Sequence, residues 1–239
     1  MLDNHLLENL SGALAADVRR RLTPLDYVSG DILAEPNTPI DSIIFPRSGL
    51  ISIVVALDSG DQIEVGIIGR RGLLGGSAIL GAERHLNTAV CQLSGAAWSM
   101  RLPDAMEVAS ASAEFRELFI AQEQYLLAEA RQFGACNAKH LLTQRLCSWL
   151  LRAHEEAGGS ELLITQDLMA TMLGAQRASV SMLAGQLQDE ELISYRRGRI
   201  NVLNSDGLRQ RACSCHHVLE EQHEHLFRAR SYPSAGADG

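Results

Sequence analysis

Long apolar runs, a leader segment and a disulfide pattern are all missing from this sequence of 239 residues. No stretch of about 18 consecutive apolar residues exists, so we expect no membrane span. The first residues, MLDNHLLENLSGAL, lack a basic start followed by a long apolar run, and they indicate no secretory signal. The five cysteines are an odd number and do not suggest a disulfide scaffold. The expected compartment is therefore the reducing cytoplasm.

Positive charge is also in short supply. Lys and Arg number 21 against 29 Asp and Glu, which gives a formal net charge of -8. This balance weighs against a wholly non-specific nucleic-acid binder. It does not exclude a specific one, because the field that matters is local to the binding face. The chain is 46% hydrophobic and 21% charged, as ordinary globular proteins are, and its length allows one large domain or two small ones.

The first half of the chain predicts a leading helix over residues 5–22 and then a β-rich domain. Between Tyr27 and Met100, short β-rich runs alternate with turn residues: DSIIF, GLISIVVAL, QIEVGIIG, NTAVCQL and AAWSM. Many short strands at regular spacing predict an antiparallel barrel or jelly roll. The tetrapeptide DSGD between two of these runs signals a hairpin. A metal-dependent enzyme on such a barrel needs clustered histidines, and this region contains only His85, so we expect no enzyme.

From about Asp104 the pattern becomes helical, with residues three and four apart along one face of a long helix. This mostly apolar seam predicts an inter-subunit coiled coil and a homodimer, although packing against the chain's own barrel would use the same pattern. The predicted dimer-interface residues are Phe115, Leu118, Phe119, Gln122, Leu126, Glu129 and Phe133. A second amphipathic helix is expected over residues 140–154, and AGGS at residues 157–160 then breaks the chain.

The stretch TQDLMATMLGAQRASVSMLAGQL, residues 165–187, predicts two helices joined by a sharp turn. Thr165 is a natural N-cap, and Asp167 in the first turn suits the helix dipole. Gly174 permits the turn between the helices. The second helix has an apolar inner face formed by Val180, Leu183 and Leu187. The pattern is typical of a helix-turn-helix.

The outward side chains of the second helix suit a DNA groove. Such a helix lies in the major groove with its N-terminal residues at the base edges, where Arg177 is placed for a bidentate contact to guanine. The next segment, ISYRRGRINVLN, predicts two strands around a basic turn, which indicates a wing on the phosphate backbone. The predicted DNA-binding residues are Thr165, Gln176, Arg177, Ser179, Ser181, Met182, Arg196, Arg197 and Arg199.

A β-barrel, a long helix and a winged helix-turn-helix in this order resemble the Crp/Fnr family of bacterial transcription regulators. The resemblance spans roughly residues 20–215. It is carried by GDILAEPNTPIDSIIFPRSGLISIV, EVGIIGRRGLLGG and ITQDLMATMLGAQRASVSMLAGQLQDEELISYRRGRINV. It implies an α+β fold with a cyclic-nucleotide-binding-like barrel, and a homodimer joined through its long helices.

The resemblance also implies a sequence-specific regulator under the control of a signal at the barrel. Its partners would be double-stranded DNA, at a near-palindromic promoter site, and RNA polymerase. The implied domains are a sensor barrel over 1–112, a dimerisation helix over 113–137, a winged helix-turn-helix over 138–215, and a helix end with a flexible tail over 216–239.

The glycine-rich segment departs from the family's cyclic AMP site. Members that bind cyclic AMP have a glutamate early and an Arg-Ser pair late in a phosphate-binding cassette. Here Arg70 stands at the first position, and Leu86 and Asn87 stand near the second. Without that arginine a cyclic phosphate loses its principal charged partner, so cyclic AMP is disfavoured. GRRGLLGG leaves another anion open as a ligand, although its glycines also suit a simple barrel corner. The candidate effector-binding residues are Arg70, Arg71, Asn87 and Thr88.

The recognition helix departs from the best-known members as well. Arg177 matches the family's guanine-reading arginine, whereas Ala178 replaces an acidic residue and Met182 replaces a second arginine. The operator should therefore differ from theirs. From the residues alone, a second function stays open: a small-molecule or metal- or redox-sensing module whose helix-turn-helix makes protein contacts only.

The segment RACSCHHVLEEQHEHLF, residues 211–227, concentrates two cysteines and four histidines, which are zinc or iron ligands. On a helix, Cys213 and His217 would share a face at i, i+4. An iron–sulfur cluster is disfavoured, because the family's iron–sulfur sensors have cysteines near the N-terminus and this chain has none before Cys91. The weak metal candidates are Cys213, Cys215, His216 and His217, and a partly solvated terminal helix is the simpler interpretation.

Overall fold

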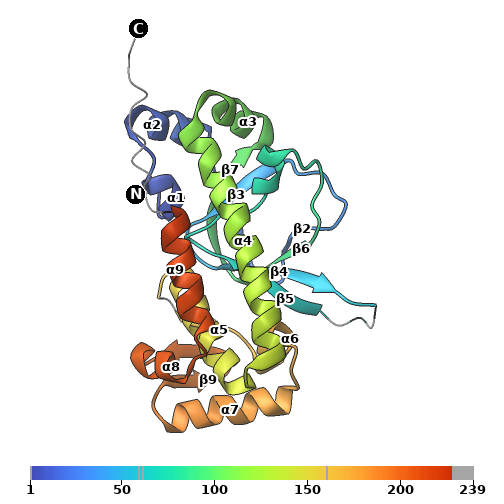
Figure 1. The fold of residues 1–239 in the computed structure, drawn as a ribbon, viewed down its shortest axis with the longest axis vertical. Coiled ribbons are helices and arrows are strands. Elements are labelled where there is room, and N and C mark those ends of the chain that lie inside the picture. The colour runs from blue at the N-terminus through green and yellow to red at the C-terminus, as the bar shows by residue number, and fades with distance from the viewer. Residues whose placement is uncertain (1, 59, 61, 160, 228–239) are drawn as a thin grey trace.

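The computed structural model describes residues 2–58, 60, 62–159 and 161–227 (Figure 1). The chain begins with α1 (His5–Glu8) and α2 (Gly12–Arg21), where the sequence predicts a single helix. The two helices are separated by residues 9–11. The predicted tail at residues 232–239 lies outside the described residues.

Seven strands form the predicted antiparallel barrel as two sheets, with strand orders β1-β7-β3 and β2-β6-β4-β5. The strands are β1 (Thr23–Tyr27), β2 (Ile32–Ala34), β3 (Ser42–Pro46), β4 (Leu50–Ala56), β5 (Gln62–Ile68), β6 (Thr88–Leu93) and β7 (Gly95–Arg101), with a short 3-10 helix, η1 (Gly76–Leu80), after β5. Ile43, Phe45 and Ile51 are fully buried. β4 and β5 pair antiparallel as far as Ala56 and Gln62, while part of the DSGD turn lies outside the described residues.

Three helices lead away from the barrel: α3 (Leu102–Ala111), α4 (Ala113–Lys139) and α5 (Leu142–Glu156). Ser112 caps α4, because its hydroxyl accepts the N–H of Phe115 at 3.2 Å. α4 ends where His140 takes an extended conformation with φ -98° and ψ 149°. α5 ends before Gly158 and Gly159, whose φ values of 80° and 75° suit glycine and explain the predicted break.

The seam predicted as a dimer interface lies on the inner face of α4. Phe115, Phe119, Gln122 and Glu129 are buried within this one chain. The other three members also face the chain itself: Leu118 packs on the N-terminal core, Leu126 on the barrel core, and Phe133 beneath the guanidinium of Arg152. The helical period identifies a buried face correctly, but it does not say what buries that face.

The second half of the chain is a winged helix-turn-helix followed by a long terminal helix. Its elements are β8 (Leu162–Leu163), α6 (Gln166–Leu173), α7 (Arg177–Asp189), β9 (Ile193–Arg196), β10 (Arg199–Val202), α8 (Ser205–Arg211) and α9 (Cys215–Phe227). Its core includes Trp149 and Leu150 of α5 with Met169, Val180 and Leu187.

α9 runs beside α4 and back towards the barrel (Figure 1). α9 is partly solvated, as the simpler interpretation expects, but one of its faces is covered: Cys215, His216 and Leu219 are buried and Phe227 packs on the N-terminal core, whereas His217 and Glu221 are exposed. Within the part of the chain that the structure describes, no helix is both long and apolar enough to cross a membrane.

Candidate nucleic-acid interface and the contacts behind it

The helix-turn-helix forms as its local spacing predicts. The side-chain hydroxyl of Thr165 accepts the N–H of Leu168 at 3.2 Å and so caps α6. Gly174 ends α6 in the left-handed conformation (φ 56°, ψ 46°), which disfavours any side chain there. Thr165 is thus a cap that holds α6, and its hydroxyl is already engaged.

α7 has one face in the core and one face in solvent. Val180 and Leu187 are fully buried. The outer face includes Gln176, Arg177 and Met182, with Met182 60% exposed, while Ser179 and Ser181 are placed beside it. Further exposed positions were missed from the sequence, among them Gly185 and Gln186. Their spacing of three and four residues from Met182 was the available signal.

Arg177 makes one charged contact, to the first turn of α6. Its Nε lies 3.2 Å from the carboxylate of Asp167, and the two side chains are 67% and 65% exposed. An ion pair this exposed contributes little, of the order of 0–1 kcal/mol. The guanidinium is therefore free to exchange Asp167 for a ligand of its own.

The wing is a two-residue hairpin between β9 and β10. Arg197 and Gly198 both have positive φ, 52° and 76°, as a type I′ turn requires. Arg196 and Arg197 are exposed at this tip. Arg199 is exposed too, but its guanidinium pairs with Glu161 at 2.6 Å. Two of the three predicted wing arginines thus make no ion pair among the described residues, and the third has a partner.

The N-terminal end of α7 lies across a groove from the β4–β5 hairpin of the barrel. An open groove of about 720 Å³ separates the β4–β5 hairpin from α6 and the start of α7. A Cβ added at Gly174 would lie 4.0 Å from Ile63 Cδ1, so the Ile63 side chain of β5 faces the helix-turn-helix turn. Gln176 and Arg177 line the same groove.

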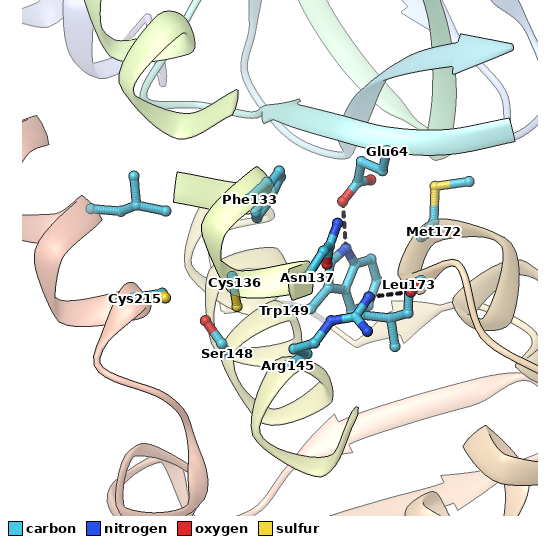
Figure 2. Close-up of a pocket in the computed structure, with 11 residues that line it drawn as sticks. Glu64, Phe133, Cys136, Asn137, Arg145, Ser148, Trp149, Met172, Leu173 and Cys215 are labelled. Carbon is cyan, nitrogen blue, oxygen red and sulfur yellow. Dashed lines mark hydrogen bonds between the residues drawn. The ribbon is translucent and has the colours of Figure 1, made fainter. Parts of the chain in front are cut away.

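A buried carboxyl joins the barrel to α5. Glu64 on β5 accepts the indole N–H of Trp149 at 2.7 Å and also accepts the hydroxyl of Ser52. Figure 2 shows the bond between Glu64 and Trp149, both of which line a small pocket. Burial raises the pKa of Glu64 to about 7, because desolvation disfavours the carboxylate. A group with this pKa changes its charge near neutral pH, at the contact between the two halves of the chain.

A buried ion pair lies between α4 and α5. Glu129 pairs with Arg152, and both side chains are almost fully buried. The backbone N–H of Ile67 on β5 donates to the same carboxylate at 3.3 Å, and the guanidinium lies 4.8 Å from the ring centre of Phe133. One carboxylate therefore joins β5, α4 and α5.

The structure does not bring the four candidate effector residues together. Arg71 donates to Glu156 of α5 at 2.7 Å and to Glu220 of α9 at 2.9 Å, so its charge is already matched. Arg70 is half-buried in the same loop, whereas Asn87 and Thr88 lie at the start of β6, and no hydrogen bond or ion pair among the described residues joins the two pairs. The expected anion site around Arg71 is not supported, because that arginine connects the barrel to α5 and α9.

A separate cavity of about 270 Å³ lies against the barrel. Its polar lining includes Thr38, Asp41, Ser42 and His85, and none of the four candidate effector residues lines it. His85 is half-buried, and burial lowers its pKa. The lining has one carboxylate and no arginine or lysine, which suits a phosphate poorly.

Of the four predicted metal candidates, the two cysteines lie together and the two histidines lie apart from them. Cys213 and Cys215 meet Cys136 and His140, with the four ligand atoms within 4.8 Å of one another. His216 lies 3.6 Å from Glu155 instead, and the exposed His217 lies 3.3 Å from Glu221. Cys213 precedes α9, so the expected helical face shared with His217 does not exist. The hydrogen bond between the Cys136 and Cys213 thiols lowers the pKa of Cys213.

Two family models match the two halves of the chain. A cyclic nucleotide-binding domain matches residues 24–112, and a Crp-like helix-turn-helix domain matches residues 144–211. Transcriptional regulator SdrP of Thermus thermophilus is 27% identical over an alignment of 199 positions, which covers 79% of this chain and 93% of that protein.

Solved structures share the fold at low sequence identity. FixK2 from Bradyrhizobium japonicum has a TM-score of 0.68 at 13% identity and covers 80% of this chain and 98% of its own. A Crp/Fnr-family protein from Eubacterium rectale has a TM-score of 0.63 at 20% identity and covers 87% of this chain and 97% of its own. These likenesses show that the barrel, long helix and helix-turn-helix form one known architecture.

Proposed function

Because this chain belongs to the Crp/Fnr family of DNA-binding transcriptional regulators, which are not enzymes, we propose that it binds a near-palindromic promoter site as a homodimer. A signal at the sensor barrel controls this binding. The observation that carries the proposal is the outer face of α7, whose exposed Gln176 and Arg177 lie at its N-terminal end while its inner face is fully packed.

Each outer side chain of α7 has a role that its chemistry suits. Arg177 reads a guanine through two N–H donors, and Gln176 reads the neighbouring base. Ser179 and Ser181 bond to bases or phosphates, and Met182 packs on a thymine methyl group, where a second arginine would have demanded an acceptor. At the wing, Arg196 and Arg197 bind phosphates, and Arg199 joins them by leaving Glu161.

The dimer forms through the outer face of α4. Ile120 and Leu127 are 37% and 51% exposed there, seven residues apart. They belong to a second set of residues, called the outer seam below, at the alternating spacings of four and three that are typical of a coiled coil: Ile120, Gln124, Leu127, Arg131, Gly134 and Ala138. Leaving apolar side chains in water is unfavourable, and a second copy of the same helix covers them. We therefore propose the outer seam, in place of the inner-face residues, as the dimer interface.

The barrel controls DNA binding through its contact with the helix-turn-helix. Ile63 and Gly174 line the same groove, and Glu64 bonds to Trp149, so a change in β5 is transmitted to α5 and α6. The signal shifts the population between this arrangement and one in which both copies of α7 fit successive major grooves, about 34 Å apart. The acidic cavity beside the barrel favours an effector other than a cyclic nucleotide.

Transcriptional control requires two further partners. We propose that the protein acts in the cytoplasm, where promoter DNA lies, and that it contacts RNA polymerase there.

The experiment is selection of sheared genomic DNA by the purified protein at physiological salt, followed by sequencing of the retained fragments. The proposal expects an enriched inverted repeat whose half-site centres are about 10 base pairs apart. Purified Arg177→Ala, carried through the same selection, should retain no enriched motif. Fragments that match the input in composition, from protein shown to be folded and with metal and reductant both tested, would contradict the proposal.

A further inference from the structure

Three cysteines and a histidine meet at the point where α4 ends and α9 begins. Cys136 Sγ lies 3.5 Å from Cys213 Sγ, and Cys215 Sγ lies 3.4 Å from His140 Nδ1. All four ligand atoms lie within 4.8 Å of one another. The three cysteines are almost fully buried, and His140 is half-buried. These four residues are called the Cys3His cluster below.

Two local structures supply the ligands in pairs. Cys136 and His140 are four residues apart across the end of α4, where the N–H of His140 donates to the carbonyl of Cys136 at 2.9 Å. Cys215 is the first residue of α9, and Cys213 precedes it by two residues. Gln132, one turn before Cys136, donates its amide to Cys215 Sγ at 3.0 Å. Such outer donors orient and stabilise metal-bound thiolates.

The spacing of the four atoms suits a single ion. Zinc with bonds of about 2.3 Å to sulfur in tetrahedral geometry holds its sulfurs about 3.8 Å apart. The Cys136–Cys213 sulfur distance of 3.5 Å is near that value, whereas a disulfide needs about 2.05 Å. The Cys215 sulfur lies 3.4 Å from His140 Nδ1. An iron–sulfur cluster places several iron and sulfide atoms between its cysteines, and these ligand atoms lie too close together to enclose one.

We propose that the Cys3His cluster binds one thiophilic divalent cation, of which zinc is the natural representative, in a closed four-coordinate site. Three thiolates and a neutral imidazole are the ligand set that structural zinc sites use. Binding releases the thiol protons to solvent, and the ion neutralises most of the resulting charge. With all four positions filled by protein, the ion holds structure together and performs no chemistry on a substrate.

The position of the site gives it a regulatory consequence. The ion would fasten the end of α4 to the segment between α8 and α9, so it would fix the DNA-binding half against the long helix. α9 then continues along α4 to Glu220 and its pair with Arg71 of the barrel. Loss of the ion would release both ends of this connection and lower DNA affinity. This consequence rests on the proposed function, but the site itself does not.

The first test measures zinc in wild-type protein purified under reducing conditions, without DNA. We expect one zinc per chain after dialysis, and cobalt(II) in its place should give the charge-transfer and ligand-field bands of a tetrahedral thiolate site. Cys136→Ser and Cys213→Ser should each lower zinc affinity at least about tenfold. Cys91→Ala is the matched control, because Cys91 lies in the barrel core and should leave the zinc content unchanged.

A second pair of variants keeps the test decisive if a cysteine variant fails to fold. His140→Ala should weaken zinc binding, whereas His140→Cys should retain zinc and strengthen the cobalt charge-transfer band. Wild-type protein that takes up neither zinc nor cobalt overturns the site. A Cys136–Cys213 disulfide formed in the presence of reductant and zinc, or normal zinc affinity in both cysteine variants, overturns it equally.

The regulatory consequence has its own measurement. DNA affinity is compared before and after zinc removal by a chelator, and after zinc is restored. We expect a reversible loss of at least about tenfold, and an unchanged affinity would overturn the coupling while the metal site stands. Arg177→Ala, which should bind the selected motif more weakly but keep its zinc, separates failure of the proposed function from failure of the site.

Discussion

α4 and α7 are both two-sided helices, and their outer faces differ in a way that their inner faces do not. Each inner face is packed in the chain's own core, at Phe119 in α4 and at Val180 in α7. The outer face of α4 presents Ile120 and Leu127, whereas that of α7 presents Gln176 and Arg177. An apolar stripe gains from covering by a like surface, and donors on flexible stems suit the base edges of DNA. The inner face thus determines where a helix lies, and the outer face determines what it meets.

The largest effect is expected from placing a charge on the outer face of α4. Leu127→Glu would bury two carboxylates against each other in the dimer, so the chain should be monomeric in sedimentation velocity. Affinity for a site with two half-sites should fall about 100-fold or more, because a monomer binds each half-site without the help of a linked second chain. Fluorescence anisotropy measures this fall.

Leu86→Glu is the matched control for that variant, since Leu86 is 81% exposed and lies far from the outer seam in the sequence. It should sediment and bind DNA as wild type does. A Leu127→Glu protein that still sediments as a dimer would show that the outer seam is not the interface.

The next effect concerns the polar outer face. Arg177→Ala should weaken binding to the selected motif by at least about tenfold, since a guanine contact contributes about 1–3 kcal/mol. Binding to unrelated DNA should change far less. Arg20→Ala, another exposed arginine, should change neither. Asp167→Asn should act in the opposite direction and tighten binding a few-fold, because it removes the carboxylate that competes for Arg177. Equal losses on both kinds of DNA would remove Arg177 from base reading.

A smaller and sequence-independent effect is expected at the wing. Arg197→Ala should reduce the slope of log affinity against log salt by about 0.9 for each phosphate that the wing ceases to neutralise, or about 1.8 per dimer. Arg199→Ala should reduce it less, because Arg199 already pairs with Glu161. Titrations at several salt concentrations measure both slopes, and an unchanged slope in Arg197→Ala would place the wing away from phosphate.

The last prediction concerns an inner contact, Glu64, and its expected effect is on stability. The folded pKa of Glu64 is raised to about 7 from an ordinary 4.5, so between these pH values the folded state holds a proton that the unfolded state has released. Wild-type stability should therefore fall as pH rises through this window, with the full cost present above pH 7. Glu64→Gln has no such cost, so the Tm of the variant minus the Tm of wild type should increase from pH 5 to pH 8. A constant Tm difference across that range would contradict the raised pKa.

The features that follow from local spacing could be predicted from the sequence. Thr165, Gly174 and Val180 lie within 16 residues of one another, and a helix, a cap and a turn need nothing more distant. The strand runs of the barrel are local in the same sense. The omission of Gly185 and Gln186 was avoidable, because the period that places Met182 outward also places them there.

The features that depend on distant segments could not be predicted. The period along α4 marks Phe119 as buried, but a barrel and a partner leave the same pattern. Polar members at Gln124 and Arg131 concealed the outer seam. Cys136 and Cys213 are 77 residues apart, and Arg71 and Glu220 are 149 apart, so only the path of α9 along α4 brings them together.

The most direct test of the account counts chains on DNA. A duplex with the selected inverted repeat and a duplex with one half-site destroyed are each mixed with the protein and weighed by native mass spectrometry. The account predicts two chains on the intact duplex, bound at least about 100-fold more tightly than on the half-site duplex. One chain per duplex, with equal affinity for both, would contradict the division of labour between the outer faces of α4 and α7.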